Sequence, residues 1–378
     1  MKPEFNALFE EIKLPNGVVL NDCLGVAPMT TYSGNPDGTV SDEELLYYRR
    51  RSNIGSLFIT ACIAVSENGI AFPGQFIAFK EDLIMPRLKQ LAAEMKTNGN
   101  KAILQMQHGG RQGQPELIKA NETVAPSSVG GTPEKAAPRE LTAEEITNII
   151  GDFGETTRRA IEAGFDGVEI HGANTYLLQQ FVSEATNRRE DEWGGSFENR
   201  LKFPLAVLAE VKRVAAEFAN EEFIVGYRLS PEEYSDLGVG YTIEETKVLT
   251  EKLIEGGIHY LHVSLMDYKK RPHNEAIEGT IVEILSKQIA GRAAFVVVGN
   301  VRKPEDAVAA LKEGADIVVM GRQALVDPEW TEKVKQGKED EIFHSVPKER
   351  KGKLDIPGPL WQLMSMYKMV EIEEEVNV

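Results

Sequence analysis

The sequence predicts a single (β/α)8 TIM barrel with an N-terminal hairpin and a C-terminal extension. Eight short apolar segments, rich in Val and Ile, alternate with segments of helical periodicity along the 378 residues. The short segments are continuously apolar, which is typical of parallel strands covered on both faces. Two connections are longer than a barrel needs, and such loops usually form a pocket wall. We expect the barrel to span residues 1–342 and the extension residues 343–378.

The strand elements follow in order from the N-terminus. Ile12–Leu20 is expected to form a hairpin, because Asn16-Gly17 separates two short apolar runs. The barrel strands are expected at Asp22–Met29, Ser56–Cys62, Ala102–Met106, Gly167–Ile170, Phe223–Leu229, Tyr260–Val263, Ala294–Val298 and Ile317–Met320. Their regular alternation with helical segments indicates a closed parallel barrel.

Helix boundaries are also marked in the sequence. Apolar residues recur at helical spacing through Glu144–Ala163, and Gly164 suits the left-handed residue that ends a helix. Pro304 suits the first position of a helix. Capping boxes, in which Ser or Thr is followed three residues later by Glu, are expected at Ser41, Thr142 and Thr242.

Charge and composition exclude several classes of protein. A formal net charge of −17 argues against nucleic acid and anionic membranes as partners. The N-terminal residues lack the apolar stretch of a signal peptide, and no apolar run approaches the length of a membrane span. Only two cysteines occur, so we expect a reducing, cytoplasmic location without a disulfide framework. Neither a glycine-rich dinucleotide motif nor iron–sulfur or metal-ligand spacing is present.

The fourth expected strand runs directly into His171, Asn174 and Tyr176. TIM barrels place their chemistry at the C-terminal ends of the strands. His171 and Asn174 could donate two hydrogen bonds to one carbonyl or nitro oxygen, and Tyr176 could protonate a carbanion that forms beside it. The alternatives are a histidine that only caps the strand and a tyrosine that packs at the start of the next helix.

A phosphate site is expected where the last two strands end. Gly299 and Asn300 follow the seventh strand, and Gly321 and Arg322 follow the eighth. Glycines let backbone amides approach a phosphate closely, and arginine adds a fork of donors. This pattern implies a phosphorylated ligand but does not identify it. His259 and His262, beside the sixth strand, are expected to be packing residues.

Two blocks of sequence resemble the old yellow enzyme family of FMN-dependent ene-reductases. They are Gly164–Arg200, which includes His171-Gly-Ala-Asn174-Thr-Tyr176, and Phe295–Pro328; the likeness extends from about Leu14 to Pro328. The resemblance implies that FMN at the barrel mouth is reduced by NADH or NADPH. Hydride then passes from flavin N5 to the β-carbon of an enone, enal or nitroalkene. Both substrates would use one flavin face in turn, so kinetics would be ping-pong without a separate nucleotide domain.

The residues at the other strand ends suit a flavin in type and placement. By resemblance, Thr30 bonds the flavin C4 carbonyl, Gln105 and Arg228 hold the pyrimidine edge, and Arg228 stabilises the reduced flavin. The full expected set for the cofactor is Pro28, Met29, Thr30, Ala61, Gln105, Arg228, Gly299, Asn300, Gly321 and Arg322. The substrate would meet His171, Asn174, Tyr176 and Tyr32. Singly, each of these residues has an ordinary packing or ion-pair role, and their joint presence favours the cofactor.

Three departures from the family pattern are visible. Thr30 stands where many bacterial members have Cys, and Trp193 stands where Tyr is usual. Some dimeric members insert a C-terminal Arg into the partner's pocket, but no Arg follows Arg350 here. The sequence therefore does not indicate a dimer built on this exchange, and a homo-oligomer of another kind stays an open alternative. The alternative functions are a non-catalytic or generic flavin-binding barrel, and a flavin reductase that uses oxygen or quinones.

Overall fold

The computed structural model describes residues 1–130 and 136–373, and within them eight parallel strands close into a barrel. In chain order they are β3 (Leu24–Val26), β4 (Leu57–Ile59), β6 (Lys101–Gln107), β9 (Gly167–Gly172), β10 (Ile224–Leu229), β13 (Tyr260–Ser264), β14 (Ala294–Val298) and β15 (Ile317–Met320). The hydrogen-bonded order runs β4-β3-β15-β14-β13-β10-β9-β6, and β6 pairs with β4 to complete the ring. The predicted TIM barrel is therefore confirmed.

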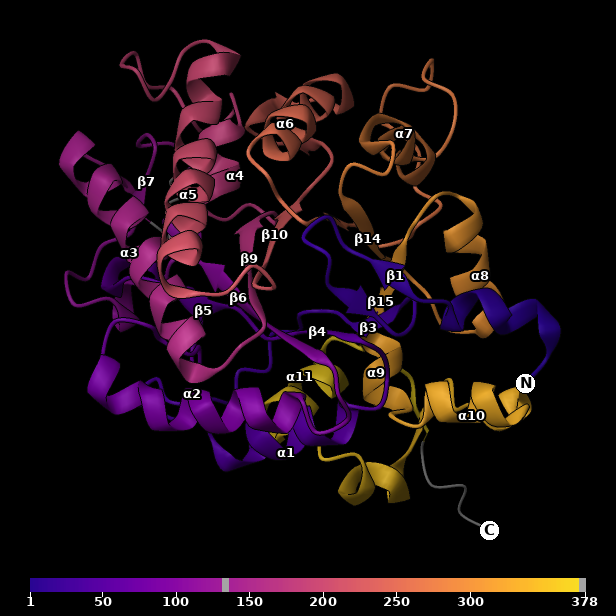
Figure 1. The fold of residues 1–378 in the computed structure, drawn as a ribbon. Coiled ribbons are helices and arrows are strands. Elements are labelled where there is room, and N and C mark those ends of the chain that lie inside the picture. The colour runs from indigo at the N-terminus through magenta and orange to yellow at the C-terminus, as the bar shows by residue number, and fades with distance from the viewer. Residues whose placement is uncertain (131–135, 374–378) are drawn as a thin grey trace.

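Helices cover the outside of the barrel (Figure 1). They are α1 (Asp42–Arg51), α2 (Glu81–Met95), α3 (Ala143–Ala163), α4 (Leu177–Val182), α5 (Phe197–Phe218), α6 (Ile243–Glu255), α7 (Ile281–Ile289), α8 (Pro304–Lys312), α9 (Arg322–Val326) and α10 (Trp330–Gln336). No helix of the described ranges is long and apolar enough to cross a membrane.

Most predicted helix ends are confirmed, with one exception. Thr142 and Thr242 both form capping boxes, and Gly164 closes α3 with a φ of 86°. The expected capping box at Ser41 is wrong, because only one of its two hydrogen bonds is present. The Ser41 side chain accepts from the backbone N–H of Glu44, but the Glu44 carboxyl is buried and hydrogen-bonded to the Thr31 hydroxyl instead of turning back to cap the helix.

The barrel interior is apolar at its N-terminal end. The predicted hairpin is confirmed as β1 (Ile12–Lys13) and β2 (Val19–Leu20), which pair antiparallel. Leu14, Val18 and Leu20 of this hairpin belong to one buried cluster with residues from the barrel strands, which include Leu57, Ile59, Ile103, Ile224, Tyr260, Val296 and Val319. The hairpin thus closes this end of the barrel with apolar contacts.

Polar side chains replace apolar ones toward the C-terminal ends of the same strands. Side chains on a strand alternate between its two faces, so Gln105, Glu169, His171, Arg228 and His262 continue the inward rows. The strand register arranges them in two adjoining rows: Gln105 lies opposite Glu169, while Arg228 lies opposite both His171 and His262. The fold therefore stacks a polar layer on an apolar one.

The chain beyond the last barrel helix returns to the barrel and packs beside α1 (Figure 1). It contains β16 (Val346–Pro347), α11 (Gly358–Met366) and β17 (Ile372–Glu373), and the two strands pair in parallel. Arg51 donates to the carbonyl of Leu354 at 3.0 Å, and Glu43 accepts from the backbone N–H of Gly358 at 2.9 Å. These contacts support our proposal that residues 343–378 extend the barrel; residues 374–378 lie outside the described part.

Candidate functional site

The C-terminal ends of the strands open into two adjoining cavities. Their volumes are about 440 Å³ and 340 Å³. They share the lining residues Pro28, Met29, Asn174, Arg228 and Met369, so one extended ligand can occupy both. We call the larger one the phosphate-side cavity and the smaller one the substrate-side cavity.

The phosphate-side cavity contains all four residues expected to bind a phosphate: Gly299, Asn300, Gly321 and Arg322. A Cβ at Gly321 would lie 2.8 Å from the Met29 sulfur, and one at Gly299 would lie 2.7 Å from the Tyr268 backbone nitrogen. At Gly299 the clash is with backbone, so this position has no room for a side chain, whereas at Gly321 only the flexible Met29 side chain would have to move.

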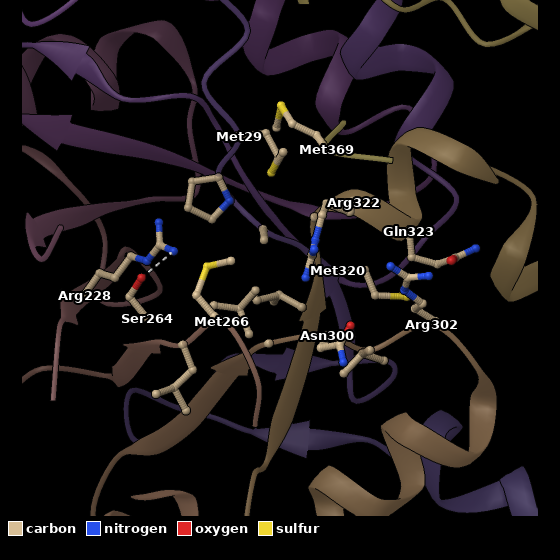
Figure 2. Close-up of a pocket in the computed structure, with 18 of the residues that line it drawn as sticks. Met29, Arg228, Ser264, Met266, Asn300, Arg302, Met320, Arg322, Gln323 and Met369 are labelled. Carbon is tan, nitrogen blue, oxygen red and sulfur yellow. Dashed lines mark hydrogen bonds between the residues drawn. The ribbon is translucent and has the colours of Figure 1, made fainter. Parts of the chain in front are cut away.

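Arginines supply positive charge to the same cavity. Figure 2 shows Arg302 and Arg322 on one side and Arg228, bonded to Ser264, on the other. Within the described residues, the Arg322 guanidinium makes no hydrogen bond or ion pair, so its donors are available to a ligand. Arg302 was missed from the sequence because it lies two residues beyond the glycine motif. The Asn300 side chain is engaged, because its amide donates to Asp267 at 3.1 Å.

The substrate-side cavity brings together residues from five strand ends. Thr30, Tyr32, Gln105, His171, Asn174, Tyr176 and Arg228 all line it, as expected from the sequence. Ala61 does not line either cavity: it is buried, and its backbone N–H donates to the Tyr48 hydroxyl at 2.7 Å. Its neighbour Cys62 lines the cavity instead. Burial raises the pKa of the Cys62 thiol to about 12, so the thiol remains protonated.

Asn174 presents its NH2 group to the cavity. Its side-chain oxygen accepts from the Ser264 hydroxyl at 3.0 Å, and Ser264 in turn accepts from Arg228 at 3.0 Å. The backbone at Asn174 and Thr175 is left-handed, with φ of 55° and 65°. Asn adopts this conformation more readily than most residues, but it is costly for the β-branched Thr175. The N–H of Asn174 donates to Ser230 at 2.9 Å and helps to hold this turn. Sequence reasoning missed Ser264.

His171 presents a donor to the same space. Its Nδ1 accepts from the backbone N–H of Ala173 at 3.3 Å, which leaves Nε2 as the protonated nitrogen of the neutral ring. Burial, with Arg228 nearby, holds the pKa of His171 well below its usual value, so the ring is uncharged at neutral pH. His171 and Asn174 thus both offer N–H donors at the end of β9.

Tyr176 lies beside His171. Their ring centroids are 5.3 Å apart with an interplanar angle of 64°. The Tyr176 ring packs against a small buried cluster formed by Cys62, Ala71 and Phe72. Burial raises the pKa of Tyr176, so the phenol keeps its proton.

The C-terminal extension forms one wall of the substrate-side cavity. Leu360 and Leu363 from α11, followed by Tyr367 and Met369, all line it. The sequence predicted packing of this segment but no role in the site. The sequence around Leu360–Met369 has an amphipathic pattern, but periodicity does not say which surface an apolar face covers. Within residues 1–130 and 136–373, no group of three or more His, Cys, Asp or Glu is placed to hold a metal ion.

Comparisons with known proteins identify the family. The sequence model of the NADH:flavin oxidoreductase / NADH oxidase family matches residues 7–341. A probable NADH-dependent flavin oxidoreductase of Bacillus subtilis (strain 168) is 46% identical over 363 residues, 96% of each chain. NADH:fumarate oxidoreductase of Klebsiella pneumoniae (strain 342) is 40% identical over 370 residues, but this chain spans only 39% of it.

Solved structures give the same result. Morphinone reductase superimposes with a TM-score of 0.74 at 28% identity, over 88% of this chain and 90% of that one. An old yellow enzyme homologue from Zymomonas mobilis also has a TM-score of 0.74, at 25% identity, and covers 88% of this chain and 93% of that one. The chain therefore belongs to the NADH:flavin oxidoreductase family, the old yellow enzymes, whose cofactor is FMN and whose reductant is NAD(P)H.

Proposed function

We propose that this NAD(P)H-dependent flavin oxidoreductase reduces activated alkenes: enones, enals or nitroalkenes. The observation that carries the proposal is the orientation of two donors. The hydrogen bonds of His171 and Asn174 are satisfied so that Nε2–H and NH2 remain for a ligand, and the Tyr176 phenol lies beside them. Two neutral donors and a nearby acid suit a substrate whose oxygen gains charge while a neighbouring carbon needs a proton.

The residues of the two cavities fit FMN. Gln105, Thr30 and Arg228 would hold the ring system, while Arg322 and the backbone near Gly299 and Gly321 would hold the phosphate. The Arg228 Nε is buried without a partner in the described structure, and an acceptor on the cofactor would satisfy it. When bound, FMN accepts hydride from NAD(P)H and delivers hydride to the alkene.

The protein side of the reaction consists of binding and proton transfer. His171 and Asn174 would hold the carbonyl or nitro oxygen and draw electron density from the β-carbon. Tyr176 would donate its proton to the α-carbon, and its raised pKa favours the protonated form until that moment. Tyr32 and the C-terminal wall would exclude water from the reacting atoms.

The charge of the substrate-side cavity favours neutral alkenes. Arg228 is the one Lys or Arg among the described residues that line it, and that guanidinium already interacts with Glu169 and Ser264. Carboxylates such as those in the names of the fumarate and acrylate oxidoreductases would need a cation of their own. We therefore expect 2-cyclohexenone to be reduced faster than fumarate or acrylate.

The test is an anaerobic study of the two half-reactions. The purified protein should be yellow with bound FMN, bleach with NADH or NADPH, and regain colour when 2-cyclohexenone is added. Fumarate and acrylate serve as comparison acceptors under the same conditions. A colourless protein that takes up no FMN would refute the proposal. Reoxidation by oxygen or quinones, but not by the enone, would indicate a flavin reductase.

A further inference from the structure

A buried carboxylate lies in the barrel interior next to the residues that line the substrate-side cavity. Glu169, on β9, has no exposed surface. Its Oε1 accepts from the Gln105 amide on β6 at 2.6 Å, and its Oε2 lies 2.9 Å from Nδ1 of His262 on β13. Three strands therefore contribute to one buried polar cluster, and the reaction proposed above uses neither Glu169 nor His262.

The hydrogen bonds of this cluster determine how Gln105 is oriented. The Gln105 amide nitrogen is turned to Glu169, and a carboxylate can only accept. The amide oxygen of Gln105 therefore points away from Glu169, and Gln105 lines the substrate-side cavity. Gln105 thus offers an acceptor to the cavity, which matches the N3–H donor of a flavin pyrimidine ring.

Charge is balanced within the same cluster. Burial alone would raise the pKa of Glu169, but His262 and Arg228 hold it below its usual value, so the group is a carboxylate. Burial lowers the pKa of His262, which makes it a neutral ring that donates from Nδ1. Glu169 therefore offsets part of the Arg228 charge at the place where Arg228 faces the cavity.

The backbone leaves space for this arrangement. Tyr260, on β13, is fully buried, and its ring lies across Gly226 of β10. A Cβ at Gly226 would come within 2.0 Å of that ring. Gly226 pairs with Glu169 in the strand register, so a bare glycine beside Glu169 admits the aromatic ring that encloses the cluster.

We propose that Glu169 is a positioning residue for the flavin. It fixes the Gln105 amide with its oxygen toward the pyrimidine edge and moderates the positive charge of Arg228, while His262 completes its hydrogen bonds. The inference rests on FMN binding as set out above. Desolvating a buried, paired carboxylate costs free energy, so the stability of the fold alone does not explain Glu169, and a role in positioning the cofactor does.

Two substitutions separate the charge of Glu169 from its positioning. Glu169→Gln keeps an acceptor and removes the negative charge, so the reduction potential of bound FMN should become more positive. Glu169→Asp keeps the charge but is too short for both partners, so the FMN dissociation constant should rise roughly tenfold, as for one lost hydrogen bond. The potential of Glu169→Asp should remain near that of the wild type.

Glu233→Gln is the matched control. Glu233 is also buried and also accepts from a glutamine amide, that of Gln179, at 2.6 Å, but it lines neither cavity. Its substitution should change thermal stability without changing the flavin potential or FMN affinity.

The outcomes distinguish this inference from the proposed function. A yellow Glu169→Gln variant with the wild-type potential would overturn the charge argument. Unaltered FMN affinity in Glu169→Asp would overturn the positioning argument, and that variant still tests the proposal if Glu169→Gln does not fold. A wild-type protein without FMN would instead refute the function itself.

Discussion

Replacing Tyr176 with Phe should slow alkene reduction and leave flavin reduction by NAD(P)H unchanged. Burial raises the pKa of Tyr176, so its proton is present at every ordinary pH. A positioned general acid contributes roughly 10²–10⁴ in rate, or about 2.7–5.4 kcal/mol in activation free energy. The phenyl ring would keep the packing against Cys62, Ala71 and Phe72, so the variant should fold and bind FMN.

The assay follows FMN absorbance in an anaerobic stopped-flow instrument, first with NADH or NADPH and then with 2-cyclohexenone. Tyr227→Phe is the matched control, because the Tyr227 phenol is fully buried on β10, outside both cavities, and should leave both half-reactions unchanged. Wild-type reoxidation by the enone in Tyr176→Phe would refute the acid role. A loss confined to reduction by NADH would instead place Tyr176 in nucleotide binding.

Three further predictions concern stability and the pocket wall. Burial raises the pKa of Glu44 from 4.5 to about 8. The contribution of this protonated carboxyl to the free energy of unfolding is therefore complete below pH 4.5 and is lost as the pH rises through 8. Urea titrations at several pH values should show that Glu44→Gln flattens this decline. Gly226→Ala should lower the free energy of unfolding by about 1–3 kcal/mol, because the new Cβ would meet the Tyr260 ring. Gly151→Ala is the control, since Gly151 lies in open space on α3 and its substitution should not destabilise the fold. Tyr367→Ala should raise KM for 2-cyclohexenone severalfold without altering the flavin potential; an unchanged KM would exclude Tyr367 from the substrate wall.

The barrel could be predicted because its signal is repeated along the chain. Segments such as Phe223–Leu229, apart from Arg228, and Ala294–Val298 are apolar without alternation, and each coincides within a residue with an observed strand. Closure of the barrel then brings all C-terminal strand ends together, so residues chosen at separate strand ends, such as Gln105 and Arg228, line one cavity. Ala61 departs from this pattern because Cys62, one residue later, faces the cavity.

Contacts that depend on register or on distant segments could not be predicted in this way. Strands buried on both faces show no alternation, so the sequence does not reveal that Glu169 and His262 both point inward and meet. The charged Glu169 inside an apolar strand was a usable signal, since a buried charge requires partners. Nothing local connects Ser264 with Asn174, or the extension at Tyr367 with the strand ends, because these residues are far apart in the sequence.

The two layers of the barrel interior have opposite effects on stability. The lower layer, closed by Leu14 and Leu20, buries apolar surface and stabilises the fold. The upper layer buries Glu169 and Arg228, and an apolar replacement of such a pair is often as stable or more so. Arg228 also retains an Nε without a partner in the described structure, a cost that a cofactor acceptor would remove. The polar layer is therefore better explained by the cofactor than by the stability of the barrel, and the apolar layer beneath it offsets the cost.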